Sequence, residues 1–357
     1  MQAGMIVLAC MGTLVARPVE METNLSSEWL SSEDIVLCDL AANQAVSQGG
    51  RRVDLDVARS SRRIHFSPAP TDLISRSSTR TEQRTAVGLG ARWALGERAT
   101  PSVGAGGYGG YSDFRSLWIN EYDRQLYEGM PGYAEAKPRG WHALAGLRYA
   151  LVPGSCHAQM NLVVQGDHVA PGYEPQLGGD LLRGRERLTS RTAKLSLENV
   201  LTRRLRSRLE LGITDTTGRK PRLSVQGSLN AAVGERLVLR AVAAASEEAP
   251  SFHATSLSLV LEHDWASRLF AGVLLRGYRD SGEIIDPLLV SSAAPSMSTL
   301  HAAASLRWKG ESLSLRLEAG PYRSRYDAMP LSSRHFSRLY SDRDWFRVQA
   351  SAAFTWP

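Results

Sequence analysis

The feature that most constrains this chain is a two-residue alternation of apolar and polar side chains, repeated from about residue 84 to the end. In the stretch 312–319, for example, Leu313, Leu315 and Leu317 alternate with polar residues. Successive side chains of a strand point to opposite faces, whereas leucines at every second position would scatter around a helix. The pattern therefore predicts an all-β fold in which each strand has one apolar and one polar face.

Short and long connections alternate between these runs. Tight turns fall near residues 96–98, 153–155, 201–204, 233–235, 264–267 and 309–311. Longer polar links occupy residues 123–139, 167–189, 215–221, 246–252, 279–297 and 322–344. This order places the long loops at one end of the sheet, as in a transmembrane antiparallel up-and-down β-barrel with short periplasmic turns and long external loops.

We expect about fourteen strands, an even number as in bacterial barrels. The first is Val53–Phe66, and the run 100–122 is interpreted as one long strand. The others are expected near 84–95, 139–150, 157–167, 190–200, 204–214, 221–231, 235–245, 253–264, 268–279, 298–308, 312–322 and 345–356.

The hydropathy of the chain fits a barrel and excludes a helical membrane protein. The 357 residues are 43% hydrophobic, and no apolar stretch reaches the about 18 residues that a membrane-spanning helix needs. A membrane strand hides only every second residue in lipid, so the mean hydropathy of −0.23 is compatible with one.

The N-terminal region is expected to lie outside the barrel wall. Residues 1–16 include an apolar run, Ala3–Ala16, that resembles a secretory signal peptide. Residues 17–50 fit no strand pattern and are expected to be a periplasmic or plug-like segment, with a short helix at Glu33–Val46. The barrel would then span residues 51–357. Cys38 and Cys156 either form a disulfide that tethers this segment or remain free thiols.

Aromatic residues gather at the ends of the expected strands, as in the two girdles of a membrane barrel. The soluble alternative, aromatics dispersed through a core, does not predict this clustering. The expected girdle consists of Trp93, Trp141, Tyr149, Trp265, Tyr278, Trp308, Phe354 and Trp356.

The polar face carries many charges that cannot face lipid cheaply, so it is expected to line the lumen. Two interpretations stay open: the charges pair and brace the wall, or they surround a wet lumen whose positive potential favours anions. The basic candidates are Arg148, Lys194, Arg208, Arg222, Arg240, Arg276, Arg307 and Arg316, and the acidic ones are Glu198, Glu210, Glu262 and Glu318.

Signals for enzymatic chemistry are weak. His301 and Ser305 share a strand face but lie about 13 Å apart, beyond hydrogen-bond reach. No set of spaced metal ligands, phosphate loop or cofactor motif appears, and the basic residues form no surface patch for nucleic acid. We therefore expect no catalytic residue, metal or cofactor, and no nucleic-acid partner.

Three segments carry a resemblance to known proteins: Leu117–Tyr133, Arg139–Tyr149 and Ala170–Pro175. They resemble uncharacterised bacterial outer-membrane barrel families, which lend no activity. The amphipathic last strand, ending in Phe354 and Trp356, is similar to the signal that outer-membrane barrels present to the barrel-assembly machinery. The leading hypothesis is a porin-like passive channel or uptake pore for small solutes in the bacterial outer membrane, with a preference for anions. The alternatives are a non-conducting structural barrel and a membrane-embedded hydrolase.

Overall fold

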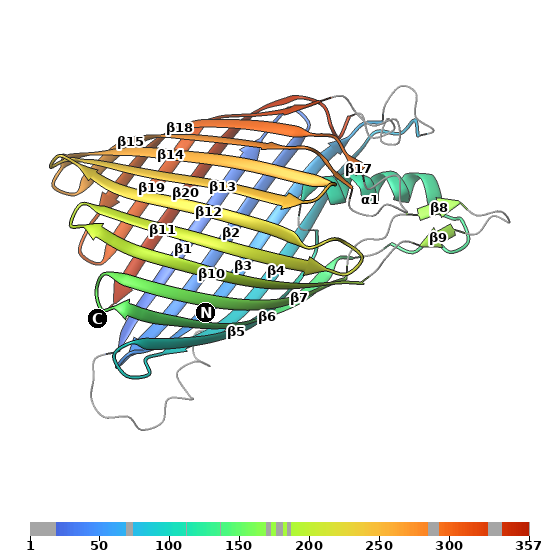
Figure 1. The fold of residues 1–357 in the computed structure, drawn as a ribbon. Coiled ribbons are helices and arrows are strands. Elements are labelled where there is room, and N and C mark those ends of the chain that lie inside the picture. The colour runs from blue at the N-terminus through green and yellow to red at the C-terminus, as the bar shows by residue number, and fades with distance from the viewer. Residues whose placement is uncertain are drawn as a thin grey trace.

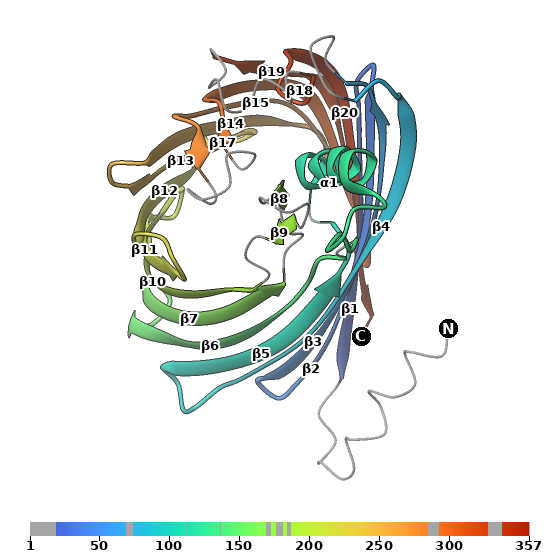
Figure 2. The ribbon, with the colours of Figure 1, turned by 90° about the vertical axis from the view of Figure 1, so that its right-hand side faces the viewer.

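Sixteen antiparallel strands close into a barrel in the computed structural model (Figures 1 and 2). The structure describes residues 19–68, 74–111, 113–135, 137–168, 173–175, 181–183, 187–284, 293–327 and 338–356. The barrel strands are β1 (Glu20–Ser31), β2 (Ile35–Gln48), β3 (Arg51–Phe66), β4 (Ser78–Trp93), β5 (Ala99–Gly109), β6 (Arg139–Val152), β7 (Cys156–His168), β10 (Arg187–Thr202), β11 (Leu205–Thr216), β12 (Arg222–Val233), β13 (Leu237–Glu248), β14 (Phe252–Ala266), β15 (Leu269–Asp280), β18 (Met297–Lys309), β19 (Leu313–Tyr326) and β20 (Arg343–Trp356). The all-β up-and-down barrel is confirmed, but the count of about fourteen strands was too low.

Smaller elements lie in the long connections. They are the helix α1 (Phe114–Tyr127) and two short hairpins, β8 (Tyr173–Pro175) with β9 (Leu181–Arg183) and β16 (Glu283–Ile284) with β17 (Ala293–Ala294). No helix among the described residues is long and apolar enough to span a membrane.

The two additional strands come from the segment expected to lie outside the wall. Residues 20–48 form β1 and β2, and β1 pairs with β20 to close the ring. The prediction of a plug-like segment with a helix at Glu33–Val46 was therefore wrong. The apolar–polar alternation of residues 20–48 is blurred, because the polar Ser27 lies on the outward face of β1 and the apolar Ile35 lies on the inward face of β2. The predicted signal peptide, residues 1–16, lies outside the described residues.

The prediction of one long strand over residues 100–122 was also wrong. β5 ends at Gly109, and the chain continues into α1. Gly110 has a positive φ of 105° that breaks the strand, and the side chain of Asp113 accepts a hydrogen bond from the backbone N–H of Ser116 to begin the helix.

The connections divide the barrel into two different ends. Tight turns lie at one end, where β1 begins and β20 finishes, and α1 and both short hairpins lie at the other (Figure 1). We call these the turn end and the loop end. Two loop-end connections, residues 32–34 and 249–251, are as short as the turns, so the alternation of short and long links is not strict.

Strand parity gives the wall an inner and an outer face. In β3, Ile64 and Phe66 are buried in the cluster that contains α1, whereas Val57, of opposite parity, is exposed. On β11, Leu209 and Leu211 are about half exposed, at 48% and 50%. A contiguous outer band of exposed leucine and valine is stable only in hydrocarbon, so this band is the lipid-facing surface.

Candidate functional site

The helix α1 lies inside the loop end of the barrel, against one side of the ring (Figure 2). Its Leu117 and Trp118 are 0% and 2% exposed, and the ring of Trp118 lies 5.1 Å from that of Phe66 on β3. Phe114 packs on Trp345 of β20, with ring centroids 5.8 Å apart. The helix is thus fixed to the inner wall by a buried cluster of aromatic and aliphatic side chains and narrows the mouth from that side.

A buried carboxylate adds a polar attachment to the same helix. Glu121 accepts hydrogen bonds from Ser78 of β4 at 2.7 Å, and from Arg124 and Gln125 of α1 at 2.8 Å. Burial opposes ionisation of Glu121, but these hydrogen bonds outweigh it and hold its pKa at about 2. The side chain is therefore a carboxylate at any physiological pH and ties α1 to β4.

A second acidic residue of α1 has the opposite character. Asp123 is 3% exposed, and its Oδ2 atom has no hydrogen-bond partner among the described residues. Burial raises the pKa of this carboxyl group well above its usual range, which favours the neutral acid. The helix consequently carries less negative charge than its sequence suggests.

On the C-terminal side of the ring, from β10 to β19, single carboxylates are shared by two cations. We call this part of the inner wall the C-terminal arc. Glu262 is 2% exposed and accepts hydrogen bonds from Arg240 at 2.6 Å and Arg307 at 3.2 Å. The same arrangement holds for Glu210 with Lys194 and Arg208, and for Glu318 with Arg276 and Arg316. Each trio retains one positive charge, so this arc has an excess of cations.

On the N-terminal side, β1–β4 with α1, the relation is reversed. We call this part of the inner wall the N-terminal arc. Arg52 pairs with both Glu22 and Asp54, each at 2.8 Å. Arg80 pairs with three carboxylates, Glu82, Glu121 and Glu135. Further inward acidic residues on these strands are Glu28, Asp39 and Asp56.

These acids make the lumen more balanced than the sequence suggested. The predicted wall began at residue 51, so the acids of β1 and β2 were not counted. The predicted lumen residues themselves all have inward parity. Arg148 pairs with Glu198 at 3.3 Å and Arg222 with Glu248 at 3.0 Å, so pairing along the wall, one of the two open interpretations, is extensive.

The aromatic candidates divide between the two faces. Trp141, Tyr149, Trp265 and Trp356 are at least 40% exposed on the outer face, and the parity of Trp93, Trp308 and Phe354 is also outward. Tyr278 lies opposite Ser256 and lines an inner-wall hollow with Lys194 and Glu210. Tyr278 is therefore not part of a lipid-facing girdle, because its strand position has lumen parity.

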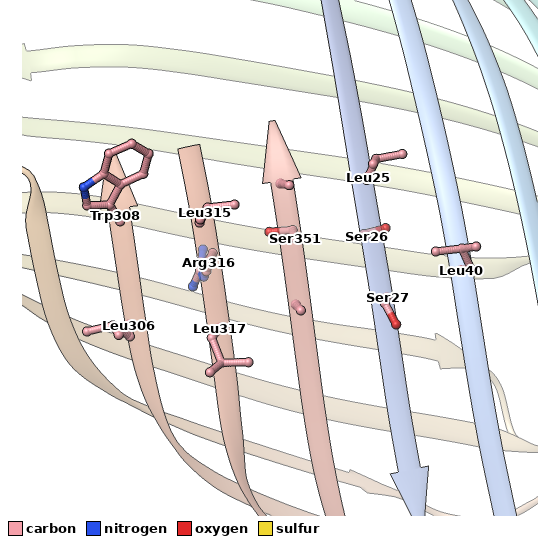
Figure 3. Close-up of a pocket in the computed structure, with 12 residues that line it drawn as sticks. Leu25, Ser26, Ser27, Leu40, Leu306, Trp308, Leu315, Arg316, Leu317 and Ser351 are labelled. Carbon is pink, nitrogen blue, oxygen red and sulfur yellow. The ribbon is translucent and has the colours of Figure 1, made fainter. Parts of the chain in front are cut away.

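A shallow groove of about 450 Å³ crosses the outer face where β20 meets β1. Leu315 and Leu317 lie on one side and Leu25 and Leu40 on the other, as Figure 3 shows. The lining is almost wholly apolar, which suits hydrocarbon. The groove belongs to the lipid-facing surface.

Among the described residues, the structure shows neither a hydrolytic pair at His301 nor a metal cluster. His301 is 3% exposed, and neither ring nitrogen has a hydrogen-bond partner there, so no serine is activated by it. Across the described residues, no group of three His, Cys, Asp or Glu is placed to hold a metal ion. Cys38 and Cys156 are free thiols on different strands, which rules out the disulfide tether in this structure.

Comparison with known proteins supports the fold. CdiB from Acinetobacter baumannii has a TM-score of 0.51 and 10% identity, covering 94% of this chain and 60% of CdiB, so this chain spans less than two thirds of that protein. A bacterial polysaccharide outer membrane secretin has a TM-score of 0.50 and 8% identity, covering 96% of this chain and all of that one. OprD from Pseudomonas aeruginosa has a TM-score of 0.45 and 10% identity, covering 94% of this chain and 95% of OprD. No family model matches the sequence, and neither does any curated protein sequence.

The barrel closure, the apolar outer band and these neighbours together define a class. The chain has the fold of a transmembrane β-barrel of the bacterial outer membrane.

Proposed function

We propose that the protein is a passive channel for small polar solutes. The observation that carries this proposal is a ring of sixteen strands whose inner face is polar and charged. Barrels of this size are too wide for wall side chains to fill, and they leave an aqueous channel. The helix α1 lies against one side of the mouth (Figure 2), so it narrows the entrance from that side.

The anion preference belongs to the same proposal. Its support is the C-terminal arc, where Glu210, Glu262 and Glu318 are each shared by two cations. The acids of the N-terminal arc reduce the net effect, so the expected preference is weak and depends on which arc a solute passes.

Single-channel recording of the purified barrel in planar bilayers tests the proposal. Stepwise conductance with a reversal potential on the anion side is expected under a salt gradient. An absence of conductance steps would exclude the channel. It would favour the alternative of a structural barrel, which is supported by the dense attachment of α1 through Glu121 and Trp118.

We also propose that β20 is the strand through which the barrel-assembly machinery recognises this protein. Its outward face ends in Phe354 and Trp356 at the turn end. Replacing both aromatics with alanine should reduce assembly in cells without affecting refolding of the purified chain into detergent.

A further inference from the structure

A hollow of about 550 Å³ opens on the inner wall at the turn end, far from α1. Arg52, Arg92 and Arg148 line it. Arg52 lies opposite Arg92 on the paired strands β3 and β4, and Arg148 lies opposite Thr100 on β6 and β5. The other lining residues are Ser47, Gly50, Arg51, Thr100, Ser102 and Gln159. No acidic side chain lines the hollow.

The three inner arginines differ in their partners. Arg52 uses its Nη1 and Nε groups for Glu22 and Asp54, and Arg148 uses Nη2 for Glu198, which leaves other guanidinium N–H groups available. Arg92 has no ion pair within the described chain. The acids orient two of the guanidiniums, while Arg92 is a cation whose own charge is not compensated by a direct partner.

Four inward glycines lie on the wall beside this hollow. Gly90 lies opposite Gly104, and Gly88 opposite Gly106, on the paired strands β4 and β5. All four have inward parity, and the imidazole of His142 lies over Gly106. A solute can approach the wall most closely beside Gly90 and Gly104, next to the hollow.

We propose that the hollow is a binding site for a small oxyanion, a carboxylate or phosphate group carried by a solute. Arg92 supplies a cation that has no direct ion pair among the described residues, Arg52 and Arg148 supply oriented N–H donors, and Ser102 and Thr100 supply hydroxyls. Guanidinium groups match the geometry of both oxyanions. The site rests on the proposed channel function only for the route by which the solute arrives, because binding itself requires no conduction.

Binding to the full chain in detergent micelles tests the site directly. The probes are inorganic phosphate, followed by phosphorus NMR line broadening, and carbon-labelled succinate, with glycerol as the neutral control. Both anions should bind, and glycerol should not. Arg92→Gln should weaken binding about tenfold, which corresponds to one charge-assisted hydrogen bond in a site open to water. Phosphate binding without succinate binding would restrict the ligand to phosphates, and the reverse result to carboxylates.

Arg206→Gln is the matched control. Arg206 is also an inward cation near the turn end with no ion pair among the described residues, but it lies on β11, outside the hollow. Its neutralisation should leave binding unchanged. Equal weakening by both variants, or none by Arg92→Gln, would overturn the site.

Two further measurements keep the outcome decisive. Ser102→Ala removes only a hydroxyl and should cause a smaller loss, which remains informative if Arg92→Gln assembles poorly. Conductance is recorded separately on the same preparations. Binding without conductance would reject the channel and retain the site, whereas conductance without binding would reject the site alone.

Discussion

The N-terminal and C-terminal arcs use the same residue types in opposite ratios. In the N-terminal arc one arginine, Arg80, is shared by Glu82, Glu121 and Glu135. In the C-terminal arc one glutamate, Glu262, is shared by Arg240 and Arg307. In each network, the single side chain of one charge sign, Arg80 or Glu262, binds all the side chains of the other sign; we call it the minority residue. The two sides of the lumen therefore share their charges in opposite ways, although the inward charges overall are nearly balanced.

The first prediction has the largest expected effect and tests whether the strands of both arcs belong to the membrane-spanning wall. Leu25→Arg on β1 and Leu259→Arg on β14 place a charge in lipid, which costs about 2–4 kcal/mol at the midplane. Both should impair assembly into the membrane, measured by heat-modifiable migration on gels. The matched changes Ser26→Arg and Ser258→Arg point inward and should be tolerated. Equal tolerance of Leu25→Arg and Ser26→Arg would mean that β1 is not a membrane strand.

The second prediction compares the loss of stability when a minority residue is replaced with the loss when one of its partners is replaced. Glu262→Gln should destabilise the barrel more than Arg240→Gln, because it leaves two guanidiniums without a carboxylate. Arg80→Gln should likewise destabilise the barrel more than Glu82→Gln does. The expected loss is about 1–3 kcal/mol for each minority residue, as for other buried groups left unsatisfied. Urea unfolding midpoints measure it. If replacing the arginine destabilised the barrel more than replacing the glutamate in both arcs, the contrast between the two arcs would be wrong.

The third prediction concerns pH and applies to the N-terminal arc. The pKa of Glu121 in the folded protein, about 2, lies below its ordinary value of 4.5. Its contribution to docking of α1 is therefore complete above about pH 4.5 and is lost as the pH falls toward about 2. A fluorophore attached to Glu128→Cys, with Cys10, Cys38 and Cys156 replaced by serine, should report this release. In Glu121→Gln the acid response should be much smaller, and an unchanged response would assign it to other groups.

The smallest expected effect is on selectivity. Neutralising Arg222, Arg276 and Arg316 together should shift the permeability ratio toward cations by about twofold, because salt screens wall charges over about 10 Å at 0.1 M. Neutralising Asp54, Asp56 and Glu82 should shift it toward anions. Reversal potentials under a salt gradient measure both. Shifts of the same sign would show that the arcs do not act as oppositely charged walls.

The sequence by itself determined the local geometry of most of the wall. Alternation in stretches such as 312–319 identified the strands and their two faces, because a period of two fits a strand with one apolar and one polar side and does not fit a helix. It also identified the turn positions. It did not reveal β1 and β2, whose small and polar outward residues, such as Ser27, weaken the pattern. The helix had a usable signal: Asp113 three residues before Ser116 is a cap, and Phe114, Leu117, Trp118 and Tyr122 follow helical spacing.

Only the tertiary structure decided how these faces meet. Closure through β1 and β20 brings Glu28 within 2.8 Å of Arg347, residues from opposite ends of the chain. Which cations share a carboxylate depends on strand register, as does the inward position of Tyr278, and register is set by pairing across the whole ring. The docking of α1 depends on apolar inward residues of β2, β3 and β20, which alternation alone assigns to a polar face. The sequence therefore specified strands with two faces, while the charge pattern of the lumen arose from the order in which closure placed them.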